Sequence, residues 1–246
     1  FVVGSSGIGK SALVRAVQEP ILRRRGYFAA GKFDQYNRDI PFSSLVQAFR
    51  DLLRQILTED RNRFGMYKTR LMEALASEGR VMTEVIPEVE LFIGSPPAIV
   101  ELPPADNRER FIRIFKRFIH VFAHQDHPLV IFLDDLQWAD TATLELLVAM
   151  FENEVPSAFL FMGAYRDNEV DATHPLIRTI GQLENKGAKL ERIELGPLTL
   201  ENIGALVGGA LRCSSTDVEE LAQIIFDRTG GNPFYCTRYL QSLHDD

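Results

Sequence analysis

The glycine-rich loop near the start of the chain is the feature that most constrains the fold. The apolar run Phe1–Val3 has the character of a buried strand end, and "SALVRAV" from residue 11 has the pattern of a helix. Between them, Gly4–Ser11 reads GSSGIGKS and fits G-x-x-x-x-G-K-[ST] at every fixed position. Such glycines let backbone N–H groups turn toward a polyphosphate, and the following helix directs its positive end at the same anion. A strand, a phosphate-binding turn and a helix in this order predict an α/β protein that binds a nucleotide.

Each position of this loop has an expected role. The Lys10 ammonium can reach the β- and γ-phosphates, and the Ser11 hydroxyl is placed to ligate Mg²⁺. A glycine-rich turn without a ligand is the alternative, but average residue usage makes a chance match rare, about 1% for a chain of this length. The residues expected to contact the nucleotide are Gly4, Ser5, Ser6, Gly7, Ile8, Gly9, Lys10, Ser11 and Ala12.

A second motif, PLVIFLDDLQWAD, supplies the acids that hydrolysis requires. Leu129–Leu133 has the composition of a buried strand, and Asp134 and Asp135 follow it directly. Phosphoryl transfer to water needs a carboxylate that organises the metal and a group that orients the attacking water. We expect Asp134 to bind Mg²⁺ through water, and Asp135 to act with Lys10 in catalysis by polarising the attacking water. An acidic turn without a metal is the alternative, and the upstream phosphate loop disfavours it.

Short apolar runs alternate with longer helical patterns over the first part of the chain. This alternation predicts a parallel α/β sheet with helices on both faces. Four phenylalanines at helical spacing, from Phe111 to Phe122, predict a core-facing stripe on one helix, and Asp106 is expected to cap its start. The predicted strands are Phe1–Val3, Tyr27–Phe33, Leu129–Leu133, Ala158–Ala164 and Leu190–Leu195. The predicted helices are Lys10–Arg24, Phe42–Leu57, Met66–Ser77, Asn107–His124, Thr141–Glu154 and Pro175–Lys186.

The pattern changes after "LGPLTL", where only helical stretches follow. These stretches are Glu201–Leu211, Thr216–Asp227 and Phe234–Leu243. We therefore predict a boundary near Leu195–Pro197, with an α/β domain over 1–195 and a small helical lid subdomain over 196–246. Between the second predicted strand and the next helix, "GKFDQYNRDIPF" carries Tyr36, Asn37 and Arg38, a mixture typical of an interaction loop without an assignable chemistry.

Together, the loop, the "LDDLQWAD" segment and the later motifs resemble the AAA+-related P-loop ATPases of the STAND group (signal transduction ATPases with numerous domains). More narrowly, they are similar to the origin-recognition-like AAA ATPase module found beside kinase, cyclase and histidine-kinase domains. The resemblance spans nearly the whole chain. It implies a three-layer P-loop NTPase fold with a five-stranded sheet in the order 5-1-4-3-2, a helical lid that closes over the nucleotide, and ATP with Mg²⁺ as ligands.

The resemblance also implies roles for two later residues. Arg166, at the end of "FLFMGAYRD", would sense the γ-phosphate, where the alternative is a surface arginine. Pro233, in "GGNPFY", would lie near the adenine, although the bare sequence shows only a helix-stop glycine before a helix-starting proline. Motor-type AAA+ proteins usually carry an arginine where Phe234 stands here, and no arginine finger is identified, with Arg178 before the fifth predicted strand no more than a candidate. Both departures favour a slow, switch-like ATPase.

The bulk properties limit the partners and the setting. The net charge of −7 argues against nucleic acid and acidic membranes, and no apolar stretch approaches the roughly 20 residues that cross a bilayer. Two cysteines fit reduced thiols and a cytoplasmic location. Because Phe1 lies inside an apolar run, we expect the chain to be an internal piece of a longer polypeptide, so this sequence neither shows nor excludes targeting signals.

Three functions follow from these patterns. The first is an ATP-binding and slowly hydrolysing switch that drives a fused output domain (kinase, histidine kinase or cyclase) or a partner protein, with nucleotide-dependent self-association as a further expectation. The second is a nucleotide-stabilised scaffold without useful turnover. The third is an origin-recognition-like DNA loader, which the negative charge disfavours.

Overall fold

The computed structural model of the 246-residue chain describes residues 1–36, 40–152, 155–214 and 218–245. Asn37 and Arg38 of the predicted interaction loop lie outside the described residues. The same holds for Asn153 and Glu154, at the end of one predicted helix, and for Thr216, at the start of another.

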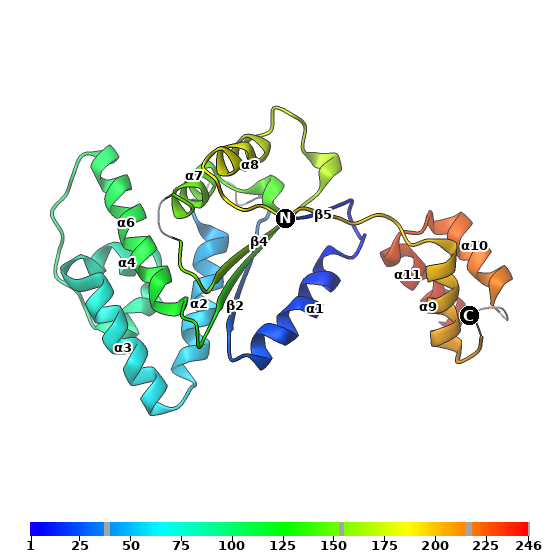
Figure 1. Ribbon diagram of the computed structural model, residues 1–246, viewed down its shortest axis with the longest axis horizontal. Helices are drawn as coiled ribbons and strands as arrows, with labels where there is room; N and C mark the ends of the chain where they lie inside the picture. The colour runs from blue at the N-terminus through cyan, green and yellow to red at the C-terminus, as the bar shows by residue number, and fades with distance from the viewer. Residues whose placement is uncertain (37–39, 153–154, 215–217, 246) are drawn as a thin grey trace.

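A five-stranded parallel sheet forms the centre of the larger part of the molecule (Figure 1). Its strands are β1 (Val2–Val3), β2 (Tyr27–Lys32), β3 (Leu129–Asp134), β4 (Phe159–Tyr165) and β5 (Ile193–Glu194). They lie in the order β2-β3-β4-β1-β5, which confirms the expected order 5-1-4-3-2 read from the other edge. The register pairs Lys32 with Asp134 and Val3 with Tyr165, so the carboxyl ends of four strands meet at one edge.

Helices cover both faces of this sheet, as the alternating pattern predicts. On one face, Val14 of α1 packs against Val2, Phe132 and Ala164. The opposite face packs against α2, α6 and α7, which lie on the other side of the sheet from α1 in Figure 1. The helices of this part are α1 (Lys10–Arg23), α2 (Ser43–Leu57), α3 (Arg61–Leu75), α4 (Gly79–Val85), α5 (Glu90–Ile93), α6 (Pro104–Phe122), α7 (Thr141–Met150) and α8 (Pro175–Asn185).

The aromatic stripe of α6 lies in the core, as predicted. The ring of Phe49 on α2 contacts those of Phe115, Phe118 and Phe122, with centroids 5.6, 5.1 and 6.4 Å away. Phe111, at the stripe's start, is half-buried against Phe42. Edge-to-face and tilted contacts of this kind stabilise a packed core beyond simple burial.

Two details differ from the sequence prediction. The α6 helix begins at Pro104, so Asp106 lies in its first turn and does not cap it; that prediction was wrong. Proline is favoured at the first helical position because its fixed φ suits the helix and its missing N–H would have no intrahelical partner there. The short helices α4 and α5 were not predicted, since seven and four residues are too few to show a clear period.

A separate group of helices follows β5. It comprises α9 (Leu200–Leu211), α10 (Glu219–Thr229) and α11 (Pro233–Asp245), and we call residues 196–246 the lid. Its buried side chains, among them Ile203, Val207 and Ile225, form a hydrophobic cluster distinct from those of the sheet. Figure 1 shows these helices beside the sheet part, joined to it by the segment after β5. The division at residue 195 stays a proposal, which this separate cluster supports.

Nothing within the described residues combines the length and the apolar character that a membrane-crossing helix requires. The longest helix, α6, has 19 residues and carries five arginine or lysine side chains.

Candidate functional site

One cavity of about 260 Å³ lies where the carboxyl ends of β2, β3 and β4 meet the glycine-rich loop and the start of α11. It brings together both predicted motifs, although more than 110 residues separate them in the sequence. The lining residues are Ser6, Gly7, Ile8, Gly9, Lys10, Ser11, Ala12, Lys32, Asp134, Asp135, Arg166 and Phe234. Three cations and two acids therefore face a single space that could receive a polyphosphate with a metal ion.

The loop between β1 and α1 has the geometry of a phosphate cradle. Gly9 precedes α1 with φ of 105°, a conformation that a side chain would strain. The Lys10 ammonium donates to the carbonyl oxygens of Gly4 (2.7 Å) and Ser5 (2.9 Å), and its side chain is buried. An ammonium has three donors, so at least one remains for a ligand in the cavity. Gly4 and Ser5 thus act on Lys10 and do not line the cavity.

Burial also affects the charge of this lysine. Desolvation lowers the pKa of Lys10, and the negative charge of Asp134 offsets part of that effect. A poorly hydrated ammonium gains more from an incoming phosphate than a fully solvated one, because less of its hydration is lost on binding. The site is therefore electrostatically prepared for an anion.

Ser11 and Asp134 bring together two oxygens that could hold a metal. Ser11 Oγ donates to Asp134 Oδ2 at 3.4 Å, so both lie on the same side of the cavity. Hydroxyl and carboxylate oxygens are hard donors that suit Mg²⁺, which usually keeps several waters and takes phosphate oxygens as further ligands. Within the described ranges, no three His, Cys, Asp or Glu side chains gather as a metal cage. The donor set therefore fits a metal that binds together with a phosphate.

Asp135 is buried and is held by three side chains. Its Oδ1 accepts from Gln137 Nε2 (3.1 Å) and Arg166 Nε (3.2 Å), and its Oδ2 contacts Lys32 Nζ at 3.2 Å. The backbone adopts a left-handed conformation with φ of 54°, which aspartate tolerates better than most residues. Because of this turn, the two adjacent carboxylates have different partners: Asp134 contacts Ser11, and Asp135 contacts Gln137, Arg166 and Lys32.

Arg166 follows the end of β4, as predicted, and extends toward Asp135, a contact that the sequence did not predict; its role as a γ-phosphate sensor stays a prediction. Its guanidinium also pairs with Glu169 Oε1 at 2.6 Å and lies 4.9 Å from the centre of the Trp138 ring. Burial on its own would lower the pKa of Arg166, but the hydrogen bond to Glu169 and the charge of Asp135 outweigh it and raise the pKa. The arginine therefore stays charged at the cavity wall.

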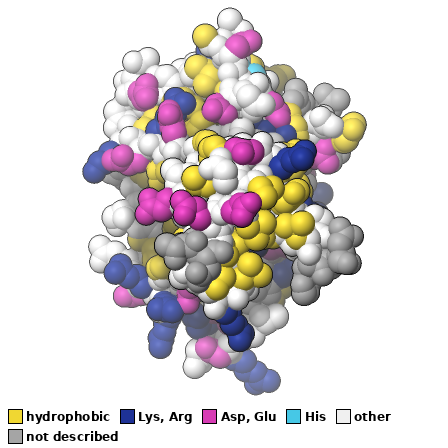
Figure 2. All heavy atoms as spheres, turned by 90° about the vertical axis from the view of Figure 1, so that its right-hand side faces the viewer, with side chains coloured by type: hydrophobic (Ala, Val, Ile, Leu, Met, Phe, Trp, Pro, Cys, Tyr) yellow, Lys and Arg dark blue, Asp and Glu magenta, His cyan; other side chains and the backbone are white. Residues whose placement is uncertain are grey.

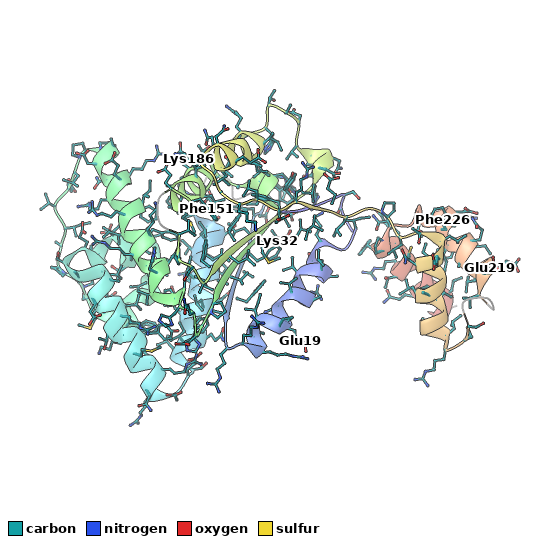
Figure 3. The ribbon with its side chains drawn as sticks, viewed as in Figure 1. Glu19, Lys32, Phe151, Lys186, Glu219 and Phe226 are labelled. Atoms are coloured by element: carbon teal, nitrogen blue, oxygen red, sulfur yellow. The ribbon has the colours of Figure 1, made fainter. Side chains whose placement is uncertain are left out.

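Sequence reasoning missed three residues of this site. Lys32 ends β2 and reaches Asp135 because strand pairing sets it opposite Asp134; Figure 3 labels it at the centre of the molecule. Gln137 is buried, and its Oε1 accepts from the backbone N–H of Arg166 at 3.2 Å. Phe234 lines the cavity from the lid. The sequence signals for two of them were a lysine at a strand end and a glutamine two residues after Asp135.

Two other predicted residues lie outside the cavity lining. Pro233 is the first residue of α11, and its neighbour Phe234 faces the cavity. Arg178 is exposed on α8. The adenine-contacting role of Pro233 and the finger role of Arg178 stay predictions.

A protein-family model matches the part of the chain that holds both motifs of the cavity. A family model described as an AAA ATPase domain matches residues 1–162, which include the glycine-rich loop and the Asp134–Asp135 pair. The matched segment ends inside β4, before Arg166 and the lid.

Several curated proteins are similar to this chain. Hybrid signal transduction histidine kinase G of Dictyostelium discoideum is 27% identical over 310 aligned residues, covering 100% of this chain and 9% of that protein. Peroxide stress-activated histidine kinase mak3 of Schizosaccharomyces pombe is 21% identical, covering 100% of this chain and 12% of that protein. Its counterpart mak2 is 28% identical, over 63% of this chain and 7% of that protein. The chain thus spans only a small fraction of each relative's length.

Proposed function

The chain belongs to the AAA ATPase domain family, and from that premise we propose that it binds ATP with Mg²⁺ and hydrolyses it slowly as a conformational switch. The shared cavity of Lys10, Ser11 and Asp134 is the observation that carries this proposal. We further propose that the module is of the STAND, origin-recognition-like type and works in the cytoplasm. Similarity to three histidine kinases supports an attached signalling output domain.

Several residues of the cavity have a proposed role in ATP binding or hydrolysis. Two of the three Lys10 donors hold the loop carbonyls, and the third, together with the ammonium charge, binds the β- and γ-phosphates. Ser11 and Asp134 hold Mg²⁺, which when bound neutralises charge that develops on the phosphates. Asp135 orients and polarises the attacking water, and Arg166 stabilises the transferring phosphoryl group. Three donors already contact the Asp135 carboxylate and leave about one of its four acceptor sites for that water, and two of them are cations that lower its basicity, which is consistent with slow turnover.

The proposed metal-binding role of Ser11 can be tested by removing its hydroxyl group. Ser11→Ala is expected to weaken ATP binding roughly tenfold in Mg²⁺, because a ligand to a charged centre is lost. Titration calorimetry in Mg²⁺ and again in EDTA measures the effect, which should vanish in EDTA. Ser11→Thr keeps the hydroxyl and serves as the matched control, with affinity near that of the parent. Equal Mg²⁺-dependent affinity for Ser11→Ala and the parent would remove Ser11 from the metal site.

A second candidate, a nucleotide-stabilised scaffold, is favoured by one observation. The Asp135 carboxylate contacts two cations, Lys32 and Arg166, which compete with a water for its oxygens. A single-turnover assay with excess protein over radiolabelled ATP distinguishes the two functions. Appearance of phosphate over hours supports the slow ATPase, whereas intact bound ATP supports the scaffold.

A DNA-loading role is not favoured by the charge distribution. The lid residues 196–246 carry seven aspartates or glutamates against three arginines. Figure 2, which looks onto the lid, shows acidic side chains interspersed with hydrophobic ones on its outer face. A duplex phosphate backbone would be repelled there, since non-specific DNA binding depends on lysine and arginine.

A further inference from the structure

The lid touches the phosphate loop directly through the turn before α11. Asn232 Nδ2 donates to the carbonyl oxygen of Ser6 at 2.9 Å, and the backbone N–H of Phe234 donates to the carbonyl oxygen of Gly7 at 3.2 Å. The fit is close, because a Cβ placed on Gly7 would lie 2.9 Å from both Asn232 Oδ1 and Phe234 Cβ. The loop and the lid therefore meet at two consecutive peptide groups, Ser6–Gly7 and Gly7–Ile8, and the Asn232 side chain holds the first of them.

The amide oxygen and the amide nitrogen of Asn232 bond to different parts of the molecule. Its Oδ1 accepts from the N–H of Phe234 at 3.1 Å and so caps the start of α11, while its Nδ2 holds the loop. A cap needs only an acceptor, which serine, threonine or aspartate would also provide. The bond to Ser6 needs a donor in addition, and the amide of asparagine offers both.

The contacts to the loop use its carbonyl groups. Four consecutive carbonyls have partners: those of Gly4 and Ser5 accept from Lys10, and those of Ser6 and Gly7 accept from the lid. A phosphate is bound by backbone N–H groups, so these partners do not compete with it. Instead, these hydrogen bonds fix the orientation of the peptide groups, and each carbonyl shares its peptide plane with the N–H group of the next residue.

We propose that Asn232 is a positioning residue that couples the lid to the phosphate loop. By holding the Ser6–Gly7 peptide, it keeps the loop in its anion-binding orientation, and a bound nucleotide in turn holds the lid in place. Coupling between two sites is reciprocal, so any affinity that the lid contact adds for the nucleotide is added equally by the nucleotide to the lid contact. This inference rests on the proposed ATP binding and names the residue through which that binding reaches the lid.

An aspartate at this position separates the coupling role from the capping role. Asn232→Asp keeps the side-chain size and an equally good cap for α11, but it removes the donor and sets a carboxylate oxygen against the Ser6 carbonyl. Asn202→Asp is the matched control. Asn202 belongs to the capping box of α9 in the same lid, where its Oδ1 accepts from Thr199 Oγ1 at 2.9 Å, so its side chain is bonded within the lid and not to the loop.

The experiment uses the whole 246-residue chain and three measurements. We expect Asn232→Asp to lower ATP affinity roughly fivefold in calorimetry, the effect of one lost hydrogen bond, and Asn202→Asp to leave it unchanged. Melting temperatures without nucleotide should match between the two variants. Hydrogen exchange at the first turn of α11 should slow on ATP addition in the parent and in Asn202→Asp, and this slowing should be absent in Asn232→Asp.

Three results would overturn the proposal. If Asn232→Asp binds ATP like the parent and keeps the ATP-dependent slowing, the coupling is absent while ATP binding stands. If Asn232→Asp melts well below Asn202→Asp and exchanges fast at α11 without nucleotide, the bond to Ser6 stabilises the fold regardless of nucleotide, and the role of Asn232 is structural. If the parent itself binds no ATP, the proposed function and this inference fail together.

Discussion

Replacing Lys10 by alanine is expected to lower ATP affinity at least a hundredfold. The ammonium is buried at the cavity wall and, in the proposed complex, makes charge-assisted contacts to two phosphates through its charge and the one N–H donor that the loop carbonyls leave open. Losing them costs about 3 kcal/mol, which corresponds to more than two orders of magnitude in the dissociation constant. Titration calorimetry with Mg²⁺-ATP measures this directly.

The control for this variant must separate binding from folding. Lys68→Ala removes an ammonium that is exposed on α3 and does not line the cavity, so it should bind ATP like the parent. Because Lys10 also joins the carbonyls of Gly4 and Ser5, the melting temperature of each variant should be recorded without nucleotide. A folded Lys10→Ala protein with parental affinity would show that the loop is not the phosphate site.

Replacing Asp135 by asparagine is expected to reduce ATP hydrolysis about a hundredfold or more while ATP affinity changes little. General-base groups typically contribute factors of this size, and asparagine keeps the shape of the side chain without its basicity. Asparagine also tolerates the left-handed backbone that Asp135 adopts, so the turn should survive the change. Phosphate release under single-turnover conditions gives the rate, and calorimetry gives the affinity.

A matched carboxylate outside the cavity lining provides the comparison. Asp167 is exposed one residue after Arg166, and Asp167→Asn makes the same chemical change there. Its hydrolysis rate should equal that of the parent. Undiminished turnover in Asp135→Asn would transfer the role of the base to another group and would leave the buried contacts of Asp135 as structural.

The parts of the site that sequence could predict are those encoded by adjacent residues. The loop Gly4–Ser11 and the pair Asp134–Asp135 each lie within a few positions, where spacing alone determines geometry. Strand alternation predicts a parallel sheet, and the family resemblance gives the strand order that the structure confirms. Arg166 was placed correctly at a strand end because β4 has a clear apolar run before it.

The rest depends on which segments come together in space. Lys32 enters the site through the register of β2 on β3, and Phe234 enters it through the docking of the lid. A single sequence shows neither pairing, because nothing in the local pattern identifies the partner strand or helix. The Asp106 cap failed for a local reason, since Pro104 starts α6 earlier than the polar pattern suggests.

The ring beneath the Arg166 guanidinium belongs to Trp138, the one tryptophan among the 246 residues. Ultraviolet excitation selective for indole will therefore produce emission from a single position, next to the arginine that is proposed to contact the triphosphate. Any ligand that draws the guanidinium off that ring alters the polarity around the fluorophore, and so its brightness and colour. The unmodified chain thus carries a built-in optical reporter, which stopped-flow mixing can follow in real time without a dye.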